Sequence, residues 1–205
     1  MGAFSAAARG LAGLVALVAW AGLVVQFDAS MMLAGSAVGA VLAMLRYFTV
    51  LANLTLAIVL TGVALGRRGF SGASLLGGTS LAMLLVGIVY SLLLRDLIEL
   101  SGGAKLADLL LHYATPILAP IFWLAYAPKG ALRSRDPLLW AAFPTAYFAY
   151  ALARGAIEGH YAYPFMDVAS LGWPRTLLNG AVIALGFVVC GYVIVWLDGR
   201  LARRA

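Results

Sequence analysis

Charged side chains are scarce in this sequence. Asp, Glu, Lys and Arg together make up 11% of its 205 residues, whereas hydrophobic residues make up 64%. A soluble domain carries about 25% charged residues and needs a polar shell, so this composition excludes an ordinary soluble protein. The mean hydropathy of +0.99 indicates that lipid is the solvent for much of the surface. The length fits a single domain, residues 1–205.

Cysteine and histidine are also rare, which narrows the possible chemistry. The single cysteine, Cys190, lies in an apolar run, so an intramolecular disulfide and a CxxC metal or redox site are both excluded. Of the two histidines, His160 falls in a predicted loop and only His112 falls in an apolar segment. A haem held by two axial histidines within the membrane is therefore not expected. We expect neither a metal nor a cofactor.

Long apolar segments are what the sequence has in abundance. A transmembrane helix needs about 20 mainly apolar residues, and six segments come close to that length. Turn and charge signals separate them. We therefore predict an all-α fold, a polytopic membrane protein built as a six-transmembrane-helix bundle. The predicted spans are residues 6–25, 40–65, 74–94, 106–126, 138–153 and 176–196.

Basic residues alternate across these segments in the way that orients membrane proteins. Nine of the fourteen fall in the segments on one side, accompanied there by the acids Asp136 and Asp198. The positive-inside rule places that side and both termini in the cytoplasm, which agrees with an even number of spans in the plasma (inner) membrane. The net charge of +6 therefore reflects orientation, and no nucleic-acid partner is expected. The nine residues are Arg9, Arg67, Arg68, Lys129, Arg133, Arg135, Arg200, Arg203 and Arg204.

Polar side chains are concentrated in the predicted outer half of the bundle. Ionisable groups within a membrane are unfavourable unless they have partners, so they mark candidate functional positions. Five predicted helices place such groups at similar depth, which predicts a polar pocket in the outer leaflet half. Its candidate residues are Arg46, Thr49, Asn53, Tyr90, Arg95, Asp108, His112, Tyr147, Tyr150, Arg154, Arg175 and Asn179.

Helical spacing groups three of these residues. Arg46, Thr49 and Asn53 follow an i, i+3, i+7 pattern, which places them on one face of the second span. A structural interpretation stands beside the functional one, because a membrane threonine usually bonds the carbonyl four residues earlier, here that of Leu45. The membrane arginines could likewise reach out to lipid headgroups. The carbonyl-bonding role is expected for the other threonines of the span, Thr55 and Thr61.

The predicted fourth span contains a second group. Asp108 and His112 are one helical turn apart, so the carboxylate can accept from one imidazole nitrogen and fix the tautomer. Pro116 follows four residues after His112 and lacks an N–H. We therefore expect a kink beside the histidine and a free His112 carbonyl that must find another donor. A lone membrane histidine can also serve only to pack helices together.

Three motifs in this sequence resemble those of the androgen-induced membrane protein family. Its characterised members are multipass threonine hydrolases that cleave fatty acid esters of hydroxy fatty acids. The motifs resemble the family's basic–aromatic–x–Thr segment, its His segment before a proline and its Tyr-Pro-Phe-Leu-acid signature, in the same order. They are RYFTVLANL at 46–54, LHYATPIL at 111–118 and YPFMD at 163–167.

The resemblance implies Thr49 as nucleophile and His112 as its base, in a chain most similar to the bacterial six-span members. Animal members carry a second histidine shortly before the catalytic one, where this sequence has Asp108. The chemistry is coherent, since a threonine hydroxyl needs an adjacent base and a tetrahedral oxygen needs fixed donors. Asn53 and Arg46 are the nearest candidates for those donors. The expected partners are membrane lipids and a lipid-ester substrate.

Two other classes of function stay open at this point. A transporter or channel could use the polar layer as a substrate site, although the sequence has no visible repeat pair of broken helices and little polarity in the inner half. A non-enzymatic lipid-binding or scaffold protein would use Thr49 and His112 only for packing. The sequence alone favours the hydrolase through its three motifs.

Overall fold

The computed structural model describes residues 4–95, 97 and 99–203, and that part of the chain is helical, with no strand. The predicted all-α class is confirmed. Arg204, one of the nine basic residues of the predicted cytoplasmic side, lies outside the described residues. Two 3-10 turns, η1 (Arg68–Phe70) and η4 (Pro164–Met166), and two π-helical turns, η2 (Tyr90–Leu94) and η3 (Leu109–Ala114), accompany the α-helices. The α-helices are α1 (Ala6–Ala34), α2 (Ala37–Met44), α3 (Phe48–Ala64), α4 (Ala73–Val89), α5 (Gly102–Asp108), α6 (Thr115–Tyr126), α7 (Asp136–Glu158) and α8 (Val168–Ala202).

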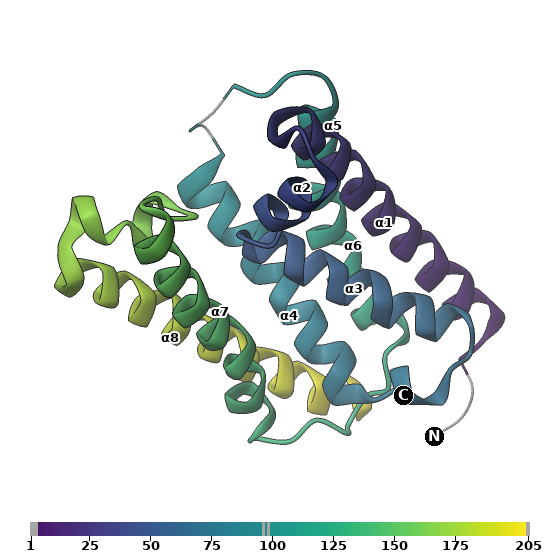
Figure 1. Ribbon diagram of the computed structural model, residues 1–205. Helices are drawn as coiled ribbons and strands as arrows, with labels where there is room; N and C mark the ends of the chain where they lie inside the picture. The colour runs from purple at the N-terminus through teal and green to yellow at the C-terminus, as the bar shows by residue number, and fades with distance from the viewer. Residues whose placement is uncertain (1–3, 96, 98, 204–205) are drawn as a thin grey trace.

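The helices form two groups that lie side by side (Figure 1). In the larger group α1 packs against α2, α3, α5 and α6, and α4 packs against α3 and α6. In the smaller group α7 and α8 pack along each other as a hairpin, and both contact α4. α4 therefore contacts both groups.

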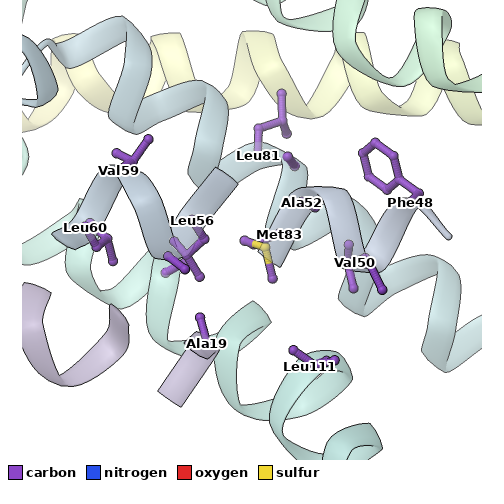
Figure 2. Packing of buried hydrophobic residues seen from close by; sticks show 14 of the residues in the cluster. Ala19, Phe48, Val50, Ala52, Leu56, Val59, Leu60, Leu81, Met83 and Leu111 are labelled. Carbon is purple, nitrogen blue, oxygen red and sulfur yellow. The ribbon is translucent and has the colours of Figure 1, made fainter. Parts of the chain in front are cut away.

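The core around α3 is built from small and branched apolar residues (Figure 2). Ala12, Ala16 and Ala19 recur along one face of α1, and the most accessible of them is 4% exposed. Small residues at such positions let two membrane helices approach closely, and this close packing drives their association in lipid. Leu56 and Leu60 on α3 belong to the same cluster and are each 1% exposed. Helix α1 therefore packs closely against α3.

Four helices are long and apolar enough to cross a membrane: α1, α4 with η2, the run from α5 to α6, and α8. α2 and α3 make a fifth if the bent pair is counted as one span. Large apolar side chains cover the outside of these helices, as at Leu17 and Leu185, which are 67% and 66% exposed. This surface is that of a membrane protein. The predicted span 138–153 is not among the five, because α7 contains prolines and several polar aromatic residues.

Two spans are longer than predicted. α1 continues to Ala34 instead of ending near residue 25, and α8 begins at Val168 instead of near residue 176. The start of α8 is set off from the rest by Gly172, whose φ of 71° is left-handed. A residue with a Cβ rarely adopts this conformation, so glycine permits the kink there.

The second predicted span is interrupted, with a 96° bend between α2 and α3 at residues 45–47. Tyrosines of α7 bind the carbonyls that the bend frees from the helix. The Tyr147 hydroxyl donates to the Arg46 carbonyl at 2.8 Å, and the Tyr150 hydroxyl donates to the Leu45 carbonyl at 3.3 Å. The bend is therefore stabilised by tertiary contacts.

The bend corrects one expectation about the polar residues of this span. Thr49 and Asn53 both lie on α3, one turn apart, and they share a face. Arg46 does not share that face, because it lies in the break and its side chain reaches α7. The predicted i, i+3, i+7 set is therefore wrong for Arg46.

The kink expected beside Pro116 takes the form of the π-helical turn η3. The N–H of Thr115 bonds to the carbonyl of Leu110, five residues earlier. In this register Pro116 would bond to Leu111, so its missing N–H frees the Leu111 carbonyl. The freed carbonyl that the structure shows is that of Leu111, which accepts from Asn53 and lies one residue before the carbonyl named in the prediction.

The two ends of the described chain lie at the same end of the bundle. The start of α1 contacts the ends of α3 and α6, and the end of α8 contacts the loop between α6 and α7. The segments that carry the predicted cytoplasmic charges therefore gather at one end. The contacts join Arg9 to Ala64, Phe4 to Phe122 and Leu132 to Asp198.

Candidate active site

Thr49 and His112 lie next to each other although 63 positions separate them in the sequence. Oγ1 of Thr49 is 3.1 Å from Nε2 of His112. Thr49 lies in the first turn of α3 and is buried, and His112 lies in η3. The predicted proximity of the two side chains is confirmed. A hydroxyl within hydrogen-bond distance of an imidazole nitrogen is the pairing that general-base catalysis requires.

Asp108 and Tyr90 hold the other side of the imidazole. Oδ1 of Asp108 is 2.9 Å from Nδ1 of His112, and the Tyr90 hydroxyl donates to Oδ2 at 2.8 Å. The Tyr90 ring also stacks on the imidazole, with centroids 4.1 Å apart and planes 19° from parallel. A carboxylate close to Nδ1 favours a proton on that nitrogen, and in this tautomer Nε2 is an acceptor for Thr49. The predicted Asp108–His112 pairing is confirmed, and it has the arrangement of a catalytic triad.

Asn53 fastens α3 to η3 behind this arrangement. It is fully buried, and its Nδ2 donates to the carbonyl of Thr49 at 2.9 Å and to the freed carbonyl of Leu111 at 3.1 Å. Its Oδ1 accepts from the Thr115 hydroxyl at 2.6 Å. Both amide hydrogens are therefore engaged, and neither is left for a tetrahedral oxygen. Asn53 instead fixes the spacing between the two helices that carry Thr49 and His112.

The usual role of a membrane threonine does not apply to Thr49. Thr55 and Thr61 each bond the carbonyl four residues earlier, at 2.8 and 2.6 Å, as expected. The equivalent acceptor for Thr49 would be the Leu45 carbonyl, which lies in the break and accepts from Tyr150 instead. The break therefore leaves the Thr49 hydroxyl to face the imidazole.

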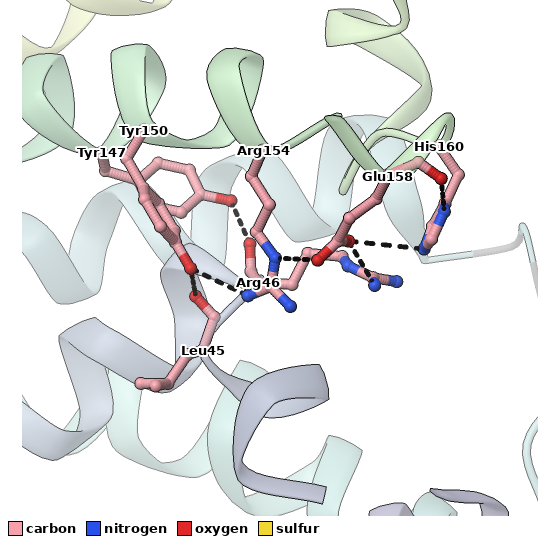
Figure 3. A network of polar contacts seen from close by, with 7 residues as sticks. All are labelled: Leu45, Arg46, Tyr147, Tyr150, Arg154, Glu158 and His160. Atoms are coloured by element: carbon pink, nitrogen blue, oxygen red, sulfur yellow. Dashed lines mark hydrogen bonds and ion pairs between the residues drawn. The ribbon is translucent and has the colours of Figure 1, made fainter. Parts of the chain in front are cut away.

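A cluster of charged residues lies beside the break between α2 and α3 (Figure 3). Glu158 binds two arginines, with Nη2 of Arg46 at 2.7 Å and Nε of Arg154 at 2.6 Å. Tyr150 accepts from Nη1 of Arg154 at 2.8 Å. This cluster ties the break to the end of α7, and it engages the Arg46 guanidinium that the sequence offered as an oxyanion donor.

The remaining candidates lie outside these two groups. Nδ2 of Asn179 donates to the Phe165 carbonyl at 2.8 Å and ties α8 to η4. Arg95 is exposed directly after η2, where its N–H bonds to the Tyr90 carbonyl at 2.9 Å. Arg175 is exposed on α8. The predicted polar layer therefore divides into the group around His112, the Glu158 cluster and these residues nearer the surface.

An apolar cavity of about 270 Å³ lies beside Thr49. α3 and α4 line one side, and the α7–α8 hairpin with η4 lines the other. The volume is near the lower end of the roughly 300–1,000 Å³ typical of ligand pockets. Thr49 therefore stands between an apolar cavity and the imidazole. The polar residues of the lining are Thr49, Thr145, Tyr90, Tyr147 and Tyr163.

Tyr163 is the residue of this region that the sequence did not bring forward as a candidate. It directly precedes η4 and lies against the start of α3, where its hydroxyl accepts from the Phe48 N–H at 3.0 Å. The hydroxyl also interacts with the N–H and the hydroxyl of Thr49. The Tyr-Pro-Phe motif was the available signal, but nothing local indicates a contact with α3, 115 positions earlier.

A second polar cluster fastens the loop between α6 and α7, at the other end of the bundle. Asp136 accepts from the Arg133 N–H at 2.7 Å and from the Ser74 hydroxyl at 3.1 Å. Nζ of Lys129 donates to two carbonyls near the end of α6, both at 2.6 Å, and burial lowers its pKa. These contacts fix the loop. In the described ranges no three His, Cys, Asp or Glu residues gather so as to hold a metal ion.

Comparison of the chain with protein-family models, with curated proteins and with solved structures found no match. The resemblance to the androgen-induced membrane protein family therefore rests on the three motifs, and it stays a prediction.

The role of Asn53 generates a stability prediction. Asn53→Leu keeps a side chain of similar size but removes the amide donor to the Leu111 carbonyl, which keeps only a 3.4 Å bond from Thr115. The Thr115 hydroxyl loses its Asn53 acceptor and keeps a bond to the Leu110 carbonyl. An unsatisfied buried polar group costs about 1–3 kcal/mol, so we expect a lower free energy of unfolding by about that amount. Denaturant titration of the purified protein in detergent measures the change.

Thr55→Val is the matched control for this prediction. Its hydroxyl bonds within its own helix and ties no second element, so we expect a change within about 0.5 kcal/mol. Equal stability of Asn53→Leu and the wild type would contradict the fastening role of Asn53.

Proposed function

We propose that this chain is an intramembrane lipid-ester hydrolase with Thr49 as the nucleophile and His112 as its base. The observation that carries the proposal is the series Thr49–His112–Asp108, joined at 3.1 and 2.9 Å, at the edge of an apolar cavity. Packing alone does not require a hydroxyl, an imidazole and a carboxylate in this order. The site needs no cofactor for the reaction.

The first half of the reaction acylates Thr49. The Thr49 proton passes to Nε2 of His112 while Oγ1 forms a bond to the ester carbonyl carbon, and the carbonyl π electrons move to its oxygen. Asp108 holds the tautomer and stabilises the imidazolium. The tetrahedral intermediate then collapses, and the bond to the alcohol oxygen breaks. The departing alcohol takes the proton from His112.

Water completes the reaction. His112 accepts a proton from a water molecule as the water oxygen bonds to the carbonyl carbon of the acyl group on Thr49. The bond between that carbon and Oγ1 then breaks, and Oγ1 regains a proton from His112. The products are a carboxylic acid and the free enzyme.

The position of Thr49 on α3 favours this chemistry. Thr49 is the second residue of α3, whose first turn contains no acidic residue. The N-terminus of a helix carries a partial positive charge, which stabilises negative charge nearby. Charge that develops at Oγ1 and at the carbonyl oxygen therefore forms in a favourable field.

The cavity indicates the class of substrate. Its lining is mainly apolar and it borders Thr49, so it fits an acyl chain whose ester carbon lies against Oγ1. The resemblance to the androgen-induced membrane protein family points to fatty acid esters of hydroxy fatty acids. Such substrates and the surrounding membrane lipids are the partners that we propose.

We propose further that α7 is a sixth span of a plasma (inner) membrane protein whose termini are cytoplasmic, with the site in the outer leaflet half. α7 has 23 residues, which corresponds to roughly 35 Å of helix and exceeds the roughly 30 Å hydrocarbon core. It packs along α8, which is apolar enough to span. The gathering of the basic segments at one end supports this orientation through the positive-inside rule.

Two cysteine variants on either side of α7 test this orientation. In a Cys190→Ala background, we expect Ser134→Cys to be protected from an impermeant thiol reagent in intact cells and His160→Cys to react. Both positions are exposed in the structure. Equal reactivity of the two would mean that α7 does not cross the membrane.

Removal of the nucleophile tests the chemistry. We expect Thr49→Ala to abolish labelling by a fluorophosphonate probe and to lower ester hydrolysis by about 10³-fold or more, because no other hydroxyl takes its place. The measurement uses purified protein in nanodiscs and a panel of fatty-acid esters. Wild-type protein that hydrolyses none of them and takes up no probe would favour a transporter or a lipid-binding scaffold instead.

Three further variants serve as controls for the Thr49 measurement. Thr49→Ser keeps a hydroxyl and should retain partial activity. His112→Ala should lower turnover by about 10²–10⁴-fold while lipid binding persists. Asp108→Asn should also lower turnover, by up to about 10⁴-fold, because it removes the charge that stabilises the imidazolium and the acceptor that fixes the tautomer. Because Thr49 and His112 act as a unit, the double variant should be scarcely worse than either single one.

Filling the cavity tests the position of the acyl chain. Ala184 lines the cavity from α8, and Ala184→Phe should lower kcat/KM for long-chain esters by about tenfold or more while short-chain esters are little affected. Ala21→Phe, at an exposed position on α1, is the control for a new phenyl ring on the surface. A loss that is the same for every chain length would place the acyl chain elsewhere.

A further inference from the structure

The candidate site lacks an obvious donor for the tetrahedral oxygen. Both hydrogens of the Asn53 amide are engaged, and Arg46 extends to Glu158 and does not line the cavity beside Thr49. A fixed donor at this oxygen is commonly a large contribution to acyl-transfer catalysis. The donor should therefore be sought among the polar groups that line the cavity beside Thr49.

Three tyrosines line that cavity, and two of them direct their protons elsewhere. The Tyr90 hydroxyl donates to Asp108 at 2.8 Å, and the Tyr147 hydroxyl donates to the Arg46 carbonyl at 2.8 Å. The third, Tyr163, is an acceptor in its contact with the Phe48 N–H at 3.0 Å. Its hydroxyl also interacts with the hydroxyls of Thr49 and Tyr147. Because the Tyr147 proton goes to the Arg46 carbonyl, the Tyr163 proton can point to either of these two oxygens, and one of them is that of Thr49.

The backbone at the start of α3 prepares Tyr163 for this role. Tyr47, which precedes the helix, provides no side-chain cap, and the Tyr163 oxygen accepts from the N–H of Phe48, which has no partner within the helix. A hydroxyl that accepts a hydrogen bond becomes a stronger donor, because bonds in a chain polarise one another. Burial raises the pKa of Tyr163, so the phenol keeps its proton at neutral pH.

We propose that Tyr163 is a catalytic residue that donates a hydrogen bond to the oxyanion formed when Thr49 attacks the ester. Before attack the phenol interacts with the Thr49 hydroxyl. Once Oγ1 has bonded to the carbonyl carbon it is a weaker acceptor, and the phenol proton turns to the adjacent carbonyl oxygen, which now carries the electron pair. No proton is transferred in this step. The role rests on the proposed Thr49 hydrolase.

Tyr163→Phe removes the donor and keeps the ring. In nanodiscs we expect kcat to fall by about 10²–10³-fold with KM changed less than about threefold, because the donor acts on the transition state. The affinity for a trifluoromethyl ketone with the same acyl chain should fall by a similar factor, since this inhibitor forms a tetrahedral adduct with Thr49. Affinity for the product fatty acid should not change.

Tyr192→Phe is the matched control, since Tyr192 is exposed on α8 and does not line the cavity. If the wild type shows Thr49-dependent hydrolysis and Tyr163→Phe leaves kcat unchanged, the donor role of Tyr163 is wrong while the proposed hydrolase stands. If Tyr163→Phe lost affinity for the product fatty acid by the same factor as for the trifluoromethyl ketone, Tyr163 would have only a packing role. A wild type without Thr49-dependent hydrolysis would remove both the proposed function and this role.

A second variant keeps the hydroxyl and so preserves the bond from Phe48. Tyr163→3,5-difluorotyrosine has a lower phenol pKa than tyrosine, and a phenolate cannot donate. The kcat of this variant should therefore fall on the alkaline side at a pH where the wild type is still active. Superimposable pH profiles of the two proteins would overturn the donor role even if Tyr163→Phe failed to fold.

Discussion

A helix that stops within a packed bundle must give its buried backbone groups other partners, because a buried polar group without a hydrogen bond is unfavourable. The break between α2 and α3 meets this constraint on both sides. The Leu45 and Arg46 carbonyls accept from tyrosines of α7, and the Phe48 N–H at the start of α3 donates to Tyr163. All of these partners come from the α7–α8 hairpin and its connection. The hydrogen bonds to the free backbone groups of the break therefore also place the α7–α8 hairpin beside Thr49, where it encloses the cavity.

A second interruption brings the imidazole to the same place. The N–H that Pro116 lacks leaves the Leu111 carbonyl free, and Asn53 binds it from α3. A π-helical turn changes the direction in which the side chains after it point, and such turns are frequent at functional sites. His112 lies in one of these turns and Tyr90 in the other, and their rings stack. Two irregular turns on adjacent helices thus supply the groups that surround the imidazole.

The sequence predicted the parts of this site that depend on local spacing. Asp108 and His112 are one turn apart, and their side chains are in contact although a π-helical turn begins between them. The Thr49–His112 contact came from the motifs, not from spacing. The break at residues 45–47 could not be predicted, because no proline or glycine marks it and its stabilising tyrosines lie about a hundred positions away. The place of Tyr163 depends on the same long-range contact.

The choice of threonine as the proposed nucleophile follows from this setting. A β-branched side chain has a strongly restricted χ1, so the backbone at the start of α3 largely fixes where the Thr49 hydroxyl points. The Thr49 hydroxyl faces His112 on one side. On its other side Thr49 borders the apolar cavity. Low polarity strengthens the hydrogen bonds among Thr49, His112 and Asp108, but it also makes an unpaired charge unfavourable there. The alkoxide character that attack requires can therefore develop only as the proton reaches the imidazole, which couples nucleophile and base into one step.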